Sequence, residues 1–150
     1  MSQQTSNVLL RRLFVIAALL DLAAGIAFLL VRMISPATIV DWVTTSPVFA
    51  GEVRDDGVAA TVNYATIAVC VVHVFITVMF LWLAVAIGRG RQRVRATVML
   101  IVTTCVDAFV ITTPIAGITQ QVVMAIAVAV KLIALAVLWA PISRRRPDLA

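Results

Sequence analysis

Residues 122–140 read VVMAIAVAVKLIALAVLWA and contain one charged side chain, Lys131. A helix of about 20 mostly apolar residues crosses the hydrocarbon core of a bilayer, so this stretch predicts a transmembrane helix. Three more stretches of the same kind occupy residues 13–31, 60–87 and 96–113. The sequence therefore predicts an all-α, polytopic membrane protein: a four-transmembrane-helix bundle that forms a single membrane domain over residues 1–150.

The composition agrees with this assignment. Of the 150 residues, 63% are hydrophobic and 13% are charged, and the mean hydropathy is +1.10. Soluble domains have about 45–50% apolar and about 25% charged residues. A soluble globular class is therefore excluded.

The arginines predict the topology, because loops on the cytoplasmic side carry an excess of Lys and Arg. Three groups fall on one side of the four predicted spans: Arg11 and Arg12; Arg89, Arg91, Arg93 and Arg95; and Arg144, Arg145 and Arg146. Both termini are then cytoplasmic, and we expect these arginines to contact lipid headgroups. Their placement explains the net charge of +5 without a nucleic-acid partner. The preference for Arg over Lys, with abundant Ala and Val, favours a bacterial inner membrane.

The outer loop, residues 32–59, contains a predicted short helix between Pro36 and Pro47. Ile39, Trp42 and Val43 have the spacing i, i+3, i+4 of one apolar helix face, which is typical of a helix lying in the membrane interface. Two functional interpretations follow, a docking surface for a partner and a lid over the mouth of the bundle. The alternative is a helix that only anchors the loop to the headgroups.

Two connections have local signals of their own. Residues 51–57, GEVRDDG, are polar and predict a solvated turn. Residues 114–121, PIAGITQQ, form a short link, so the third and fourth spans are expected to make an antiparallel hairpin.

Four ionisable residues lie inside the predicted spans: Asp21, His73, Asp107 and Lys131. Counted from the cytoplasmic arginines at 1.5 Å per residue, Asp107 and Lys131 lie about 18 and about 20 Å deep, Asp21 about 14 Å and His73 about 24 Å. Because a charge at such depth is usually paired, Asp107 is expected to face Lys131.

This intramembrane polar cluster has three interpretations. In the structural one, the Asp107–Lys131 pair pins the hairpin, Asp21 reaches Lys131 or a threonine, and His73 is neutral and hydrogen-bonded. In the transport one, the depths form a staircase for protons or cations. In the third, the charges contact the helices of a partner subunit.

No catalytic constellation is present in the sequence. It has one histidine, no His/Cys metal-binding spacing and no nucleophile or phosphate-binding motif. We therefore expect a non-enzyme with no catalytic residues, no cofactor and no metal.

The leading interpretation is an accessory, assembly or stabilising subunit of a larger bacterial membrane complex. Its partners would be membrane lipids and other membrane subunits, or copies of itself. The alternatives are a small proton-coupled transporter or ion channel and a lipid or hydrophobic-molecule handling protein.

Overall fold

The computed structural model describes residues 3–87, 93–112 and 117–140, which form helices joined by short links. The elements are α1 (Gln3–Ile34), α2 (Pro36–Thr45), the 3-10 helix η1 (Pro47–Phe49), α3 (Ala50–Asp56), α4 (Val58–Ala86), α5 (Arg93–Thr112) and α6 (Gly117–Trp139). Four of them, α1, α4, α5 and α6, are long and apolar enough to cross a membrane. The prediction of an all-helical chain with four such helices is confirmed, although α1 begins at Gln3 rather than at residue 13.

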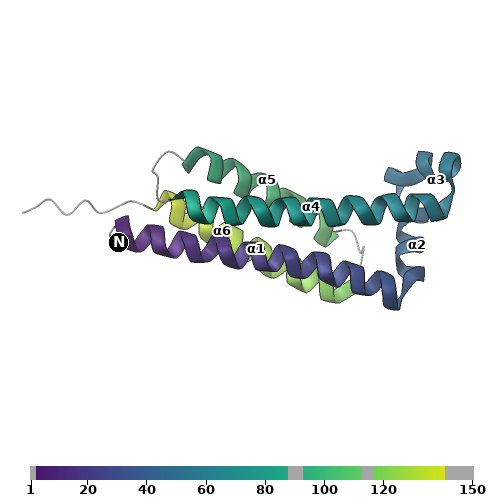
Figure 1. The fold of residues 1–150 in the computed structure, drawn as a ribbon, viewed down its shortest axis with the longest axis horizontal. Coiled ribbons are helices and arrows are strands. Elements are labelled where there is room, and N and C mark those ends of the chain that lie inside the picture. Colours follow the sequence, from purple (N-terminus) through teal and green to yellow (C-terminus); the bar gives the residue numbers. More distant parts are fainter. Residues whose placement is uncertain (1–2, 88–92, 113–116, 141–150) are drawn as a thin grey trace, which may run out of the picture.

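The four long helices run side by side, and α2 and α3 lie at one end of them (Figure 1). The N-terminal end of α1 and the C-terminal end of α6 lie at the opposite end. α1 packs against both α4 and α6, and α5 packs against α6. In contrast, α4 and α5 make few close contacts with each other.

α4 is helical although it is rich in the β-branched residues Val, Ile and Thr. In hydrocarbon an open strand would leave backbone N–H and C=O groups unpaired, whereas a helix satisfies them internally. This constraint outweighs the usual preference of β-branched side chains for strands.

α2 covers the ends of α1 and α4 and buries one apolar face against them. Pro36 opens the helix, where its missing N–H is not needed, and the extended Ser46 before Pro47 ends it. Ile39 and Val43 are fully buried.

These two side chains belong to a cluster with Phe28 and Ala65, and Trp42 packs edge-on against Phe28 with the ring centroids 6.3 Å apart. Of the residues predicted to dock a partner, Ile39 and Val43 are therefore buried by the chain itself, which corrects the docking interpretation for these two. Trp42 is half-buried, and docking through it stays a prediction.

The prediction of a turn at residues 51–57 is wrong for most of its length, because Ala50–Asp56 forms the helix α3. Val53 of this helix packs against the cluster that contains Phe28, Ile39, Val43 and Ala65, so the helix has an apolar side chain to bury. Gly57 then separates α3 from α4 with a φ of 82°, a conformation that favours glycine. Its N–H donates to the Val53 carbonyl at 3.2 Å, and its carbonyl accepts from the Thr61 N–H at 3.1 Å.

The core between the N-terminal half of α1 and the C-terminal halves of α4 and α6 is apolar. Phe14 and Phe80 stack across it with ring centroids 6.1 Å apart. Ala17, Ala18 and Ala134 are buried beside them, and such small residues let helices approach closely.

We expect Phe80→Ala to lower the free energy of unfolding in detergent by about 3 kcal/mol, the lower end of the range for buried Phe→Ala. The lower end applies because hydrocarbon does not penalise exposed apolar surface as water does. Phe75→Ala is the matched control, since Phe75 lies on the same helix but is exposed. Equal losses in the two variants, measured by thermal or denaturant unfolding, would contradict this packing.

Candidate functional site: a buried ion cluster beside a cavity

Three of the four predicted intramembrane residues meet in one ion cluster, which we call the Lys131 cluster: Asp21 of α1, Asp107 of α5 and Lys131 of α6. The Lys131 Nζ lies 2.6 Å from Asp107 Oδ2 and 3.1 Å from Asp21 Oδ2, and it donates to Asp21 Oδ1 at 3.3 Å. The side chains of Lys131 and Asp21 are 0% exposed and that of Asp107 is 1% exposed. The predicted contact between Asp107 and Lys131 is present, and it lies within one chain.

The fourth long helix also contacts this ammonium. The Lys131 Nζ lies 5.2 Å from the centroid of the Phe80 ring of α4, within the range of a cation–π interaction. Because Phe80 also stacks on Phe14, an aromatic pair lies between the cluster and the end of the bundle that holds the N-terminal end of α1.

Two of the three predicted steps of the staircase coincide in this arrangement. Asp21 contacts Lys131 directly, although residue counting places it about 6 Å nearer the arginines. Counting assumes that arginines on different helices lie at one level and that the helices run parallel, whereas the packed helices bring these side chains together. Asp21, Asp107 and Lys131 therefore form one ion cluster and not two successive positions along a path.

His73 of α4 lies apart from the Lys131 cluster. The residue is only 7% exposed, and its Nδ1 is buried without a hydrogen-bond partner. The expectation of a hydrogen-bonded histidine is therefore not met at this nitrogen. Gly25 of α1 makes room for the side chain, because a Cβ at Gly25 would lie 3.1 Å from the His73 Cβ.

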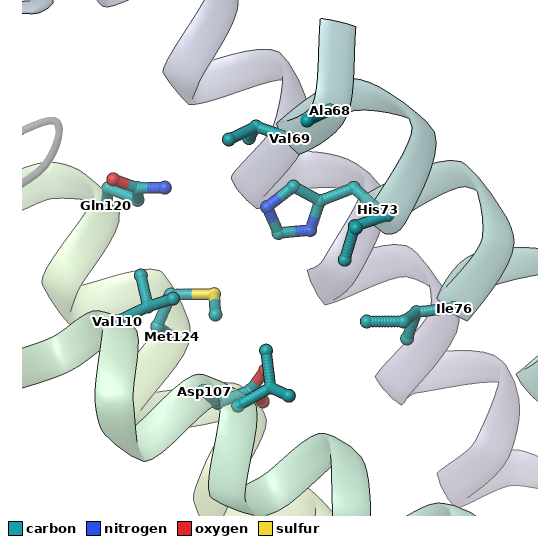
Figure 2. Close-up of a pocket in the computed structure, with 10 residues that line it drawn as sticks. Ala68, Val69, His73, Ile76, Asp107, Val110, Gln120 and Met124 are labelled. Carbon is teal, nitrogen blue, oxygen red and sulfur yellow. The ribbon is translucent and has the colours of Figure 1, made fainter. Parts of the chain in front are cut away.

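His73 and Asp107 line the same cavity, which has a volume of about 170 Å³. We call it the His73 cavity. Its other walls come from α4, α5 and α6, and Figure 2 shows the Gln120 amide and the His73 imidazole on opposite sides of it. Gln120 is 3% exposed. The sequence did not single it out, because it was assigned to the link before the fourth span, whereas α6 begins at Gly117.

A second and larger cavity of about 570 Å³ lies between α4 and α5 towards the N-terminal end of α5. Its lining is apolar apart from Arg95 and includes Met79, Trp82, Val98 and Val102. Together the two cavities follow the line along which α4 and α5 fail to pack closely, and we call this line the α4–α5 seam.

Arg32 is a half-buried polar group with a role that the sequence does not reveal. From α1 its guanidinium donates to Asn63 Oδ1 at 2.6 Å, to Thr66 Oγ1 and to the Val62 carbonyl at 3.4 Å, all on α4. These bonds join α1 to α4 near α2. An arginine just after an apolar stretch is the only signal in the sequence, and it does not distinguish this role from contact with headgroups.

The arginines predicted to contact headgroups are only partly described. Arg11 and Arg12 are exposed on α1, and Arg95 is exposed at the start of α5, where Arg93 is half-buried. Arg89, Arg91, Arg144, Arg145 and Arg146 lie outside the described residues.

In the described part of the chain, no group of three or more His, Cys, Asp or Glu residues could hold a metal ion. Comparisons with models of protein families, with curated proteins and with solved structures find no match to this chain.

We expect Lys131→Met to be the most damaging change in the Lys131 cluster, at about 3–5 kcal/mol of unfolding free energy. It leaves two buried carboxylates without their cation. Asp107→Asn should cost less, because Asp21 still pairs with Lys131. The measurement is thermal or denaturant unfolding of the purified variants in detergent.

The matched control is the triple variant Asp21→Asn, Asp107→Asn, Lys131→Met. It removes all three charges and should recover much of the loss. If Asp107→Asn proved as damaging as Lys131→Met, Asp21 would not be an effective partner of the lysine.

Proposed function

We propose that this protein is a non-enzymatic membrane subunit that stabilises or helps to assemble a larger complex in a bacterial cytoplasmic membrane. The observation that carries the proposal is the α4–α5 seam. Along it the bundle presents apolar side chains, including Val98, Val102 and Trp82, that no helix of the described chain covers.

The α4–α5 seam is suited to binding a transmembrane helix of a partner. Helices in lipid associate through close packing rather than through a hydrophobic driving force. A shallow apolar groove beside a long helix offers such packing to a cylinder about 10 Å wide. The partner would be another membrane subunit or a second copy of this chain.

The proposed orientation places the arginine-bearing ends of α1 and α5 in the cytoplasm. Arg11, Arg12 and Arg95 are exposed there, whereas the exposed acidic residues Asp41, Glu52, Asp55 and Asp56 lie on α2 and α3 at the other end. This asymmetry supports the positive-inside assignment. α2 would then lie in the outer interface as a lid on α1 and α4.

A transporter or channel is the second candidate, and one observation favours it: Asp107 joins the Lys131 cluster to the His73 cavity. The cytoplasmic side argues against it. Between the cluster and the arginines, the described core is apolar and includes the stacked Phe14 and Phe80. Ion movement would require this aromatic pair to separate.

The test is purification of the tagged protein from its native membrane in mild detergent, followed by mass spectrometry. We expect a membrane partner or a second copy at a fixed stoichiometry. Val98→Trp, which places an indole in the seam, should abolish the association. Ile101→Trp should preserve it, because Ile101 is exposed on α5 but does not line either seam cavity.

Recovery of the protein as a monomer from the mildest detergent would contradict the subunit proposal. Equal loss of the partner in both tryptophan variants would remove the seam as its binding surface.

A further inference from the structure

The His73 cavity contains a polar side chain that its own fold leaves unsatisfied. The Nδ1 of His73 is buried without a partner, and leaving a buried hydrogen-bonding group unpaired destabilises the fold. The cavity beside it has a volume of about 170 Å³. The imidazole lines the cavity, so a ligand there would lie beside the ring that carries this nitrogen.

The size of the cavity suits a ring-sized or short-chain molecule. A dry protein cavity of about 150 Å³ is large enough to bind benzene, and the His73 cavity is similar. Most of its lining is aliphatic, with Val69, Val72, Ile76, Val106 and Val110 among the residues. The body of the ligand is therefore apolar.

The mouth of the cavity faces the side of the bundle. Val72 of α4 and Val106 of α5 line the cavity, and they are also 46% and 39% exposed on the molecular surface. In a membrane this surface meets lipid chains, so a ligand would enter laterally from the bilayer between α4 and α5.

The charge of the neighbouring cluster limits the polar group of the ligand. Two carboxylates, Asp21 and Asp107, face one ammonium, Lys131, and Asp107 lines the cavity. A phosphate or carboxylate head would therefore enter a site with an excess of negative charge at low dielectric. A neutral head avoids that repulsion.

A hydroxyl is the neutral group that fits best. A neutral imidazole carries one N–H donor and one bare acceptor nitrogen, and a hydroxyl is both donor and acceptor. A hydroxyl can therefore pair with a ring nitrogen of His73 in either tautomer of the imidazole. The Gln120 amide on the opposite wall adds a further donor and acceptor.

We propose that the His73 cavity binds a neutral, membrane-dissolved alcohol or phenol, whose hydroxyl hydrogen-bonds to His73 and whose apolar body extends through the α4–α5 seam. This site does not depend on the subunit role, because every residue in it belongs to this chain. It can be tested on the purified protein alone.

The probe is para-hexylphenol, with hexylbenzene as the counterpart that lacks the hydroxyl and para-hexylbenzoate as the anionic counterpart. His73 is the only histidine, so nitrogen-15 labelling of histidine reports on this ring alone. In lipid nanodiscs we expect para-hexylphenol to shift the ring nitrogen signals saturably. Hexylbenzene and para-hexylbenzoate should bind at least about tenfold more weakly.

Ring signals that show a hydrogen-bonded Nδ1 before any addition, and that the phenol leaves unmoved, would mean that water fills the site. That outcome would overturn the proposal, as would equal shifts with hexylbenzene.

A pair of glycine variants tests the location without removing the histidine. Gly25→Ala places a methyl group 3.1 Å from the His73 Cβ and 3.3 Å from its Cγ, so it should displace the ring and weaken phenol binding about tenfold or more. Gly51→Ala meets nothing within 4 Å and should leave binding unchanged. Equal affinities in both variants would place the phenol elsewhere and overturn the assignment.

Discussion

The ammonium of Lys131 is the constraint on which the bundle depends. A charge at mid-membrane depth is tolerated only when it is paired or reaches water, and this one is fully buried. Each of the other three long helices brings a group to it: Asp21 from α1, Phe80 from α4 and Asp107 from α5. These contacts set the rotation and relative depth of four helices whose remaining surfaces are almost uniformly apolar and would pack in many registers.

The Lys131 cluster also divides the bundle into two unequal halves. Towards the N-terminal end of α1, Phe14, Phe80 and small alanines pack without a buried ionisable group among the described residues. On the other side, the His73 cavity adjoins Asp107, and polar groups such as His73 and Gln120 are buried. The apolar half is suited to holding the helices together. The other half contains a cavity and a buried polar atom without a hydrogen-bond partner, the Nδ1 of His73.

Sequence alone could predict what depends on composition and spacing. The four long apolar helices, the short helix after Pro36 and the Asp107–Lys131 contact follow from hydropathy, proline placement and depth. The Asp21 contact could not be separated from its alternatives, because it depends on the reach of the lysine side chain and on helix tilt. The burial of Ile39 and Val43 and the unpartnered His73 nitrogen depend on which helix end or face lies opposite, and one helix's periodicity does not encode this.

The proposed partner surface and the proposed ligand site both lie along the α4–α5 seam, so occupation of one would affect the other. Val72 and Val106 form the mouth of the His73 cavity, and the larger cavity around Val98 and Val102 continues the same seam. A partner helix lying along the whole seam would cover the mouth of the His73 cavity. An alcohol that had bound before the partner would then be retained, and one that arrived after the partner would be excluded. If each occupant stabilised the other by filling adjoining space, their affinities would rise together by the same factor, as linkage requires. A ligand that needed the seam open would instead weaken the partner's binding.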